Sequence, residues 1–325
     1  LERSWGKVLE TQMRFQSIAF IVAMSVGALL YDAERLNQIF TALSFDVEVS
    51  KAFAIRIPLI LTLLLGIGAL ITALGLKEPN SEKVTRREAR QECWLATIKE
   101  ALAKTLDTGK WILNTPVAMM IILGGFLIDH IARMILTLNS EYYRRIDLPE
   151  ASFGIISAGF GLMGLFTPRL GRWLSENRTK TFNFSLIGIV TFFGLLGMTK
   201  FVPYWGVAPM ILIYGSIGLT GFLVSAYMNA ETPSSARATA LSFKGLSYNL
   251  AYGGIGLIYS LLVYNLRRTE SMQAVPAEHV EAELFKSALS YFPSYFIVAF
   301  VLVLLFGLLN RRSIDTSPLK KDDST

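Results

Sequence analysis

The sequence predicts an all-α integral membrane protein, and its composition, its long apolar runs and the placement of its basic residues all support that fold class. Of its 325 residues, 52% are hydrophobic and 17% are charged, and the mean hydropathy is +0.45. A soluble domain of this length could not bury so much apolar surface. Because backbone amides in a bilayer must be hydrogen-bonded within their own segment, we expect the apolar runs to be helices.

Eight segments are long enough to cross a hydrocarbon core of about 30 Å, which requires about 20 mostly apolar helical residues. The sequence therefore predicts eight transmembrane helices. They are Phe15–Tyr31, Ile57–Leu76, Trp111–Leu138, Ala151–Leu170, Phe182–Met198, Tyr204–Met228, Ala238–Leu266 and Ser287–Asn310.

Basic residues favour one set of connecting segments, as expected when cytoplasmic loops retain positive charge. That set comprises the N-terminal segment, the interval Lys77–Lys110, the segment after the fourth span, the segment with Arg237 and Lys244 that leads into the seventh span, and the C-terminal tail with Arg311 and Arg312. We therefore expect a multi-pass protein of the cytoplasmic (inner) membrane, with both visible termini on the cytoplasmic side.

The charged interval Lys77–Lys110 divides the chain into groups of two and six spans and is interpreted as a cytoplasmic linker. Within it, apolar residues recur at spacings of three and four, which predicts an amphipathic helix along the membrane surface. A soluble helix packed on the loops is the alternative. The expected divisions of the chain are 1–76, 77–110, 111–310 and a cytoplasmic tail, 311–325, while the polar stretch Arg267–Lys286 is expected to be an external loop. The apolar residues of the amphipathic helix are Trp94, Leu95, Ile98, Leu102 and Leu106.

Two segments combine glycine and arginine at the cytoplasmic ends of predicted spans. One is the stretch GLFTPRLGRW, and the other runs from Thr232 to Gly256 and leads into a Gly-rich helix. Glycines permit tight turns and close helix approach, and arginines can bind phosphate headgroups or helix-end carbonyls. We interpret both segments as gating and packing elements rather than substrate sites. Their key residues are Gly164, Arg169, Gly171, Arg172 and Arg237.

With these motifs and this order of elements, the chain resembles the major facilitator superfamily, whose members have two six-helix halves joined by a long cytoplasmic linker. The resemblance covers nearly the whole chain and implies helices five to twelve of an N-terminally truncated 6+6 bundle. Residues 1–76 would then be the last two helices of the N-terminal half, and 111–310 the six-helix C-terminal half. Pro168 stands where the first motif usually has an acidic residue. The antiporter signature is missing near Gly27, and the sugar-porter motif is missing after the second span.

Three ionisable residues lie inside the third predicted span, where a charged side chain costs about 2.5–3.5 kcal/mol even on insertion scales. Asp129 and Arg133 are four residues apart and can pair on one helix face. A carboxylate beside His130 can accept and release a proton as access alternates, so Asp129, His130 and Arg133 are the proton-coupling candidates. Alternatively the trio is a static ion pair near the outer interface, because Asp129 lies about 27 Å along a helix that starts at Trp111.

Lys244, Tyr248 and Tyr252 follow one another at four-residue intervals in the seventh predicted span, with Asn249 adjacent. Such a polar and aromatic stripe can line a cavity and orient a small organic substrate. Helix packing and interfacial anchoring by tyrosine are the alternative for each residue. Tyr214, in the sixth span, is a further cavity candidate, with packing again the alternative.

The sequence contains no recognisable enzyme or cofactor motif, whether a nucleophile elbow, a metal-ligand pair or a Walker sequence. The single cysteine, Cys93, has no partner for a disulfide or a zinc site. The net charge of +6 is spread between apolar runs, which argues against a nucleic-acid partner. We therefore expect no enzymatic activity, no cofactor and no metal.

The expected function is that of a major-facilitator-type permease, a secondary active transporter that moves a small organic solute across the cytoplasmic membrane by alternating access. Proton coupling is an open option that depends on Asp129 and His130. The expected partners are the lipid bilayer, a small-molecule substrate and protons, with the protein acting as a monomer. The alternative is a polytopic membrane protein that does not transport: a receptor, a lipid-handling protein or an intramembrane enzyme.

Overall fold

The computed structural model describes residues 2–30, 33–42, 44, 49–54, 56–75, 94–233 and 236–315, and these residues form helices and no strands. The predicted all-α class is therefore confirmed for this part of the chain. The elements are α1 (Glu2–Leu30), α2 (Ala33–Ala42), α3 (Lys51–Ala54), α4 (Ile57–Leu74), α5 (Trp94–Asn114), α6 (Pro116–Thr137), α7 (Asn139–Arg145), η1 (Glu150–Ser152), α8 (Phe153–Asn177), α9 (Lys180–Met198), α10 (Val207–Glu231), α11 (Arg237–Arg267), α12 (Glu270–Gln273), α13 (Val280–Ser290), α14 (Phe292–Leu309) and α15 (Arg311–Ile314).

Seven helices in the described residues are long and apolar enough to cross a membrane. They match the second to eighth predicted spans. The first predicted span falls within α1, whose stretch from Phe15 to Leu30 has no charged residue. Because α1 is not among the seven, the eighth transmembrane helix stays a prediction. The seven are Ala52–Leu74, Pro116–Thr137, Phe153–Asn177, Lys180–Met198, Val207–Glu231, Arg237–Arg267 and Val280–Leu309.

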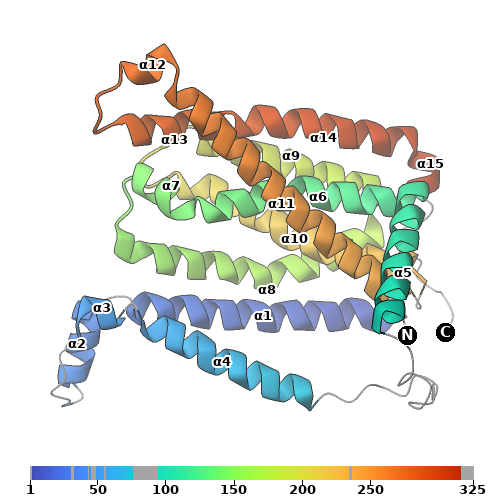
Figure 1. Ribbon diagram of the computed structural model, residues 1–325, viewed down its shortest axis with the longest axis horizontal. Helices are drawn as coiled ribbons and strands as arrows, with labels where there is room; N and C mark the ends of the chain where they lie inside the picture. Colours follow the sequence, from blue (N-terminus) through green and yellow to red (C-terminus); the bar gives the residue numbers. More distant parts are fainter. Residues whose placement is uncertain are drawn as a thin grey trace.

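Helix α6 occupies the centre of the bundle and contacts α9, α10, α11 and α14 (Figure 1). Its apolar side chains are buried along nearly its whole length, with Ile128 and Ile131 fully so. Pro116 occupies the first turn of α6, where its missing N–H removes no helical hydrogen bond, so the chain bends there and the helix restarts. A helix that is apolar on most of its faces, as α6 is apart from Asp129, His130 and Arg133, is suited to such a central position.

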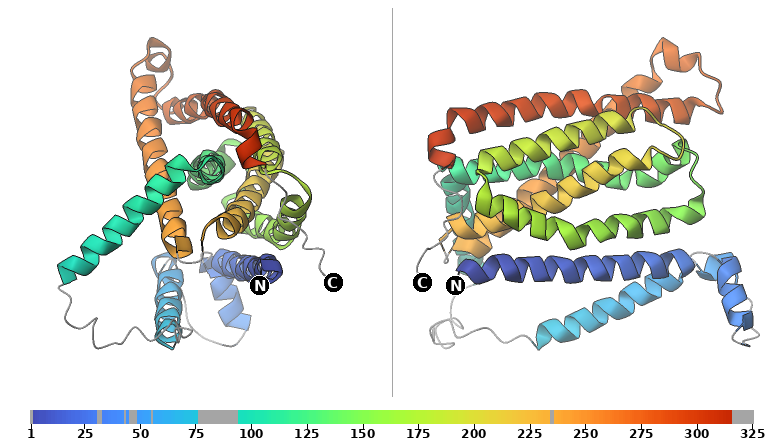
Figure 2. Two further views of the ribbon diagram at one scale, coloured as in Figure 1. Left: turned by 90° about the vertical axis from the view of Figure 1, so that its right-hand side faces the viewer. Right: turned by 180° about the vertical axis from the view of Figure 1, so that it is seen from behind.

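Helices α1 and α4 lie outside this group. Helix α1 runs alongside α8 for most of its length, and α4 lies beyond α1 and diverges from it (Figures 1 and 2). No residue of α4 is buried, and leucines stay exposed around it, including Leu65 at 73% and Leu74 at 78%. A helix with exposed leucines on all sides is unstable in water, and its natural surroundings are lipid or other membrane helices.

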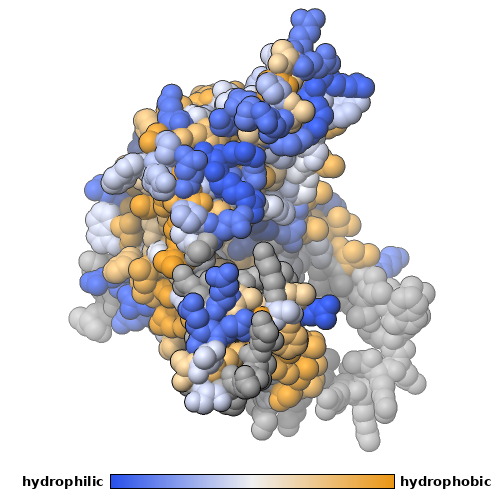
Figure 3. All heavy atoms as spheres, turned by 90° about the vertical axis from the view of Figure 1, so that its left-hand side faces the viewer, coloured by the Kyte–Doolittle hydropathy of each residue, from blue (hydrophilic) through white to orange (hydrophobic). Residues whose placement is uncertain are grey.

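Polar residues gather at the ends of the bundle. Figure 3 looks onto the end that carries α2, α12 and α13, where hydrophilic side chains collect, while hydrophobic ones appear along the flanks. The start of α1, α5 and α15 lie together at the opposite end (Figure 1). The start of α1, residues 94–114 and residues 311–314 therefore share one end of the described structure. Which end faces the cytoplasm stays a prediction.

The third predicted span, Trp111–Leu138, is wrong at its start. Residues Trp111–Asn114 belong to α5, which slopes across the end of the bundle at an angle to α6 (Figure 2). The sequence prediction missed the break because apolar residues continue on both sides of Pro116, although proline is an unfavourable residue in a helix interior. The predicted amphipathic helix is confirmed as a helix within α5, and its Leu102 and Leu106 are exposed. Whether it lies on a membrane stays a prediction, and 76–93 and 316–325 lie outside the described residues.

Two predicted loops are partly helical. The stretch Arg267–Lys286 contains α12 and the first turns of α13, because Glu281 and Glu283 favour a helix start there. Helix α8 continues to Asn177, so the GLFTPRLGRW motif is helical and its glycines make no tight turn. The turn comes at Thr179, whose side chain caps α9 by accepting a hydrogen bond from the Phe182 amide at 3.3 Å.

Candidate functional site

The structure brings together charged and polar side chains on α6 and α11, which we call the α6–α11 cluster: Asp129, Arg133, Lys244, Asn249 and Tyr252. Arg133 Nε lies 2.9 Å from Asp129 Oδ2, so the ion pair expected from their spacing is present. Arg133 Nη1 donates to Asn249 Oδ1 at 2.9 Å, and its guanidinium carbon lies 5.8 Å from the centre of the Tyr252 ring. One arginine therefore links the two helices through a carboxylate, an amide and an aromatic face.

Most of the cluster lies in the interior of both helices, and Lys244 lies nearer the start of α11, seven residues or about 10 Å beyond Arg237. Asp129 is thirteen residues beyond Pro116, or about 20 Å along a helix of about 33 Å. Asn249 is twelve residues beyond Arg237, or about 18 Å along a helix of about 46 Å. Because α6 starts at Pro116 rather than at Trp111, Asp129 lies about 20 Å rather than about 27 Å from the start of the span, and about 12 Å before its end at Thr137. This position favours a role for the ion pair within the membrane over one at the outer interface.

His130 faces a different neighbour. Its Nδ1 contacts the Phe126 carbonyl at 2.5 Å, and its Nε2 lies 2.9 Å from the Tyr295 hydroxyl on α14. Because a carbonyl can only accept, Nδ1 carries a proton, and a neutral ring then accepts from Tyr295 through Nε2. His130 is buried with both nitrogens engaged. His130 therefore makes its hydrogen bonds to groups other than Asp129, and this geometry suits a histidine that stabilises the packing of α6 against α14.

Lys244 and Tyr248 complete the α11 side. Lys244 Nζ lies 5.8 Å from the centre of the Tyr248 ring and interacts electrostatically with Asp129 and Arg133. Tyr248 is buried rather than lining an open cavity, and its hydroxyl packs against Gly125, where a Cβ would lie only 1.7 Å from that oxygen. Gly125 is therefore required for the close approach of α11 to α6, which the sequence reasoning missed. A glycine facing an aromatic residue across two helices gives no signal in a single sequence.

Tyr214 is placed away from this cluster. Its hydroxyl accepts a hydrogen bond from Asn139 Nδ2 at 2.7 Å, and its ring stacks on Phe160 with 4.2 Å between centroids. These contacts join α10 to α7 and α8. The structure therefore gives Tyr214 a packing environment, and its four companions among the cavity candidates lie elsewhere.

The Gly–Arg motif of α8 faces α1. A Cβ on Gly164 would lie 2.0 Å from Ser17 Oγ, so the two helices approach closely there. Arg172 Nη1 lies 3.3 Å from Glu10 Oε2, and Arg14 binds the other oxygen of this buried carboxylate at 2.7 Å. The sequence reasoning missed Glu10, although its spacing of four from Arg14 was a signal. The motif therefore packs and pairs between α8 and α1, and its gating role stays a prediction.

The remaining motif residues have separate contacts. A Cβ on Gly171 would lie 2.8 Å from Phe222 of α10, which makes Gly171 a close contact between α8 and α10. Arg169 is exposed. Arg237 begins α11, and its Nε donates to the Thr232 carbonyl at 3.2 Å, which closes the turn between α10 and α11.

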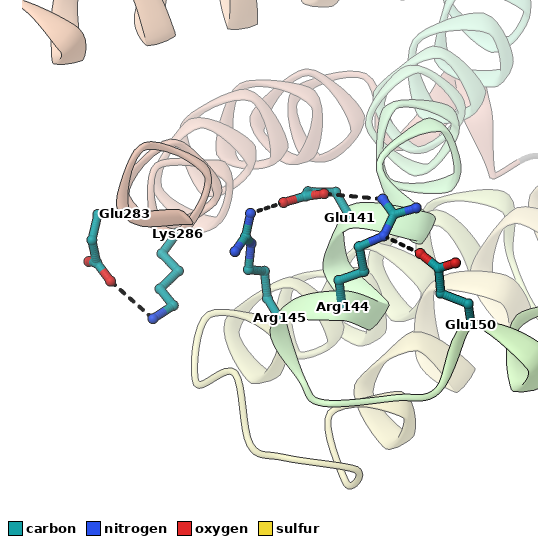
Figure 4. Close-up of polar contacts among 6 residues, drawn as sticks. All are labelled: Glu141, Arg144, Arg145, Glu150, Glu283 and Lys286. Carbon is teal, nitrogen blue, oxygen red and sulfur yellow. Dashed lines mark hydrogen bonds and ion pairs between the residues drawn. The ribbon is translucent and has the colours of Figure 1, made fainter. Parts of the chain in front are cut away.

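A second charged group lies outside the apolar spans, at the end that carries α7 and α13 (Figure 4). Arg144 binds Glu150 at 2.9 Å and Glu141 at 3.3 Å, and Glu141 also pairs with Arg145. The hydrogen bond to Glu150 raises the pKa of the exposed Arg144 guanidinium. Exposed ion pairs of this kind contribute little to stability. Their geometry ties α7 to the start of α8.

A cavity of about 350 Å³ adjoins this group, between α7, α11 and α13. Its polar lining consists of Glu141, Arg145, Tyr259 and Glu281. The carboxylates are already paired, since Glu141 binds Arg145 and Glu281 binds Arg267 at 2.7 Å. We therefore assign this cavity no ligand. Within the described ranges, no group of three or more His, Cys, Asp and Glu residues is placed to hold a metal ion.

No protein-family model, no curated protein and no solved structure matches this chain. The resemblance to the major facilitator superfamily therefore depends on helix order and on the two motifs alone. The functional argument depends on the geometry of the α6–α11 cluster.

Proposed function

We propose that this chain belongs to a secondary active transporter of the major facilitator type, which moves a small organic solute across the membrane by alternating access. The order of elements supports the proposal, since two apolar helices and a charged interval precede six further spans. The close packing of α1 on α8 is the kind of contact on which two halves can rock.

The observation that carries the proposal is the α6–α11 cluster in the interior of two membrane helices. Charged groups at such depth are costly, and they are typical of solute pathways and proton relays. Arg133 is 35% exposed on its side chain and Asn249 is also exposed, so the cluster presents an open polar surface on α6 and α11. We propose that this surface lines the solute pathway and that Asp129 is its proton-exchanging group.

Gradient-driven accumulation in proteoliposomes tests the proposal. The protein is reconstituted beside Asp129→Asn, and proton-driven uptake of candidate solutes is compared with passive solute exchange. We expect the parent to accumulate a solute against its gradient, and Asp129→Asn to retain exchange while losing accumulation, because the amide cannot release a proton.

Asp147→Asn is the matched control. Asp147 lies in the connection after α7, outside the apolar spans, and its φ of 59° is a backbone conformation that asparagine adopts readily. This variant should accumulate solute as the parent does. Accumulation by Asp129→Asn at the parent's level would refute the coupling role of Asp129, and absence of any mediated flux in the parent would refute transport.

A further inference from the structure

We infer that the solute bound at the α6–α11 cluster is an organic anion, with a carboxylate or phosphate group recognised by Lys244 and Arg133. This inference rests on the proposed function and adds the substrate class. It follows from a charge imbalance within the membrane-spanning part of the structure.

The cluster contains two cations and one carboxylate. Asp129 is committed to Arg133 by the 2.9 Å ion pair. Lys244 has no hydrogen bond or ion pair with any described residue, and the charged groups that act on it are Asp129 and Arg133. Its ammonium group is therefore an unmatched positive charge beside a neutralised pair.

The ammonium group of Lys244 points toward the cluster and not toward the start of α11. Its Nζ lies against the Tyr248 ring, one turn further into α11, and the side chain is half-buried. A lysine that only anchors a helix directs its ammonium group to the headgroups instead. An unmatched cation held among membrane helices favours an anionic ligand, because the ligand's charge would replace the missing counter-ion.

The neighbouring groups fit an organic anion better than a simple inorganic one. Tyr252 presents an aromatic ring next to Arg133, and its hydroxyl is 2.7 Å from Thr137 Oγ1. Asn249 supplies an amide that both donates and accepts. Arginine and lysine together bind a carboxylate or phosphate, while the ring and amide can contact the carbon skeleton.

A cysteine reporter beside Lys244 tests the inference without requiring transport. Gly245→Cys is made in a Cys93→Ser background, since Cys93 is the single cysteine, and a Cβ at Gly245 meets nothing within 4 Å. The rate of its reaction with N-ethylmaleimide, a neutral reagent, is measured with solutes that share a carbon skeleton and differ in charge. The sets are succinate, succinamide and 1,4-diaminobutane; benzoate, benzamide and benzylamine; and glycerol 3-phosphate and glycerol.

We expect at least one anion to slow the reaction, by about tenfold at ten times its dissociation constant, and its neutral and cationic counterparts to leave the rate unchanged. Lys244→Gln should abolish this protection, and Lys244→Arg should retain it because the charge is kept. Lys200→Gln, at an exposed lysine in the connection after α9, is the matched control and should retain protection.

Protection by a cationic or neutral member equal to that of its anion, or protection by none of the anions, would overturn the inference. So would unchanged protection in Lys244→Gln. The transport proposal is judged separately by the accumulation assay. Protection by an anion without mediated flux would support the anion-binding site and refute the transport proposal. Mediated flux of a neutral or cationic solute would support the transport proposal and refute the proposed substrate class.

Discussion

Arg133 is the residue on which the account depends most, because its side chain joins Asp129, Asn249 and Tyr252 across two helices. Removing it leaves Asp129 as an uncompensated carboxylate whose side chain is only 16% exposed. Breaking such a pair from one side costs more than removing both charges. The pair is therefore best measured by a double-mutant cycle.

We predict that Arg133→Gln and Asp129→Asn are strongly coupled in their effect on the free energy of unfolding. Arg133→Gln alone should lower that free energy by roughly 2–4 kcal/mol, and adding Asp129→Asn should restore part of the loss, with a coupling of about 1–3 kcal/mol. The exposed pair Arg267–Glu281 serves as the control, with an expected coupling below about 1 kcal/mol. Denaturant unfolding in detergent measures both cycles, and equal couplings would contradict the assignment.

We predict that Tyr142, which lies outside the apolar spans, makes the protein less stable at alkaline pH. Burial raises the pKa of Tyr142 above its ordinary value near 10. Above about pH 10 the unfolded chain loses this phenolic proton while the folded chain keeps it, so stability falls by about 1.4 kcal/mol per pH unit. Tyr142→Phe should remove this contribution, at a cost of about 1 kcal/mol at pH 7 for its hydrogen bond to the Gly206 carbonyl at 3.1 Å.

The measurement is the melting temperature of Tyr142→Phe between pH 7 and pH 11. Tyr204→Phe, at an exposed phenol in the connection before α10, is the control and should leave the pH profile unchanged. A parallel decline for Tyr142→Phe and the parent would show that Tyr142 does not contribute.

For individual residues, the sequence predicted the contacts that depend on spacing along one helix, and few others. The separation of four between Asp129 and Arg133 predicted their ion pair. It could not predict that Asn249 and Tyr252 would meet Arg133, or that His130 would turn to Tyr295, because those contacts depend on how α11 and α14 pack against α6. Adjacent residues of a helix point about 100° apart, so Asp129 and His130 have different neighbours.

Among the elements, the contact of α1 with α8 is the most specific. Ser17 of α1 lies over Gly164 of α8, whereas Gly159 on the same helix has nothing within 4 Å of the position of a Cβ. Alanine favours a helix over glycine by about 1 kcal/mol wherever there is room for its methyl group. The two glycines therefore make a matched pair that separates packing from helix propensity.

We predict that Gly164→Ala destabilises the protein and that Gly159→Ala does not. The new methyl group at Gly164 forces Ser17 and α1 to shift, with an overpacking cost of about 1–3 kcal/mol, while Gly159→Ala should be neutral or slightly stabilising. Thermal unfolding and disulfide cross-linking between cysteines placed on α1 and α8 give the two readouts. Equal effects of the two substitutions would mean that α1 does not pack on this face.

Helix identity was predictable from the sequence, and helix ends were not. Long apolar runs predicted α9 to α11 closely. The end of α8 was missed because glycine and proline in GLFTPRLGRW indicate a turn locally, whereas packing against α1 and α10 stabilises the helix through them. The end of α5 was missed because apolar residues continue on both sides of Pro116, so the sequence shows one long apolar run where the structure has two helices.

For the whole molecule, the concentration of basic residues in the connecting segments of one end predicts a defined topology. In a Cys93→Ser background, single cysteines replace exposed residues at Lys7 and Ser313 at one end, and at Thr41 and Lys200 at the other. A membrane-impermeant thiol reagent added to intact cells should label Thr41→Cys and Lys200→Cys, and label the other two only after permeabilisation.

Thr41→Cys tests the eighth span at the same time, because α1 separates it from Lys7. Labelling of Thr41→Cys and Lys7→Cys from the same face would mean that α1 does not cross the membrane. Labelling of all four positions in the reverse sense would invert the predicted orientation while keeping the fold.

The class of membrane protein was predictable because amino-acid composition indicates whether a chain is surrounded by water or by lipid. A content of 52% hydrophobic residues indicates lipid. The packing of the α1 and α4 pair beside the six-helix group was not, since nothing in a single sequence fixes which outer faces meet. The assignment to the major facilitator superfamily stays a proposal that depends on the order of elements.

We propose that solute passes over the α6–α11 cluster, and covalent blockage of that surface is a direct test of this pathway. Asn249→Cys in a Cys93→Ser background is reacted with a bulky maleimide, and solute flux in proteoliposomes is followed as labelling proceeds, with Lys200→Cys as the control. We expect flux to fall in proportion to modification of Asn249→Cys and to be unaffected by modification of Lys200→Cys. Complete modification of Asn249→Cys with undiminished flux would contradict it.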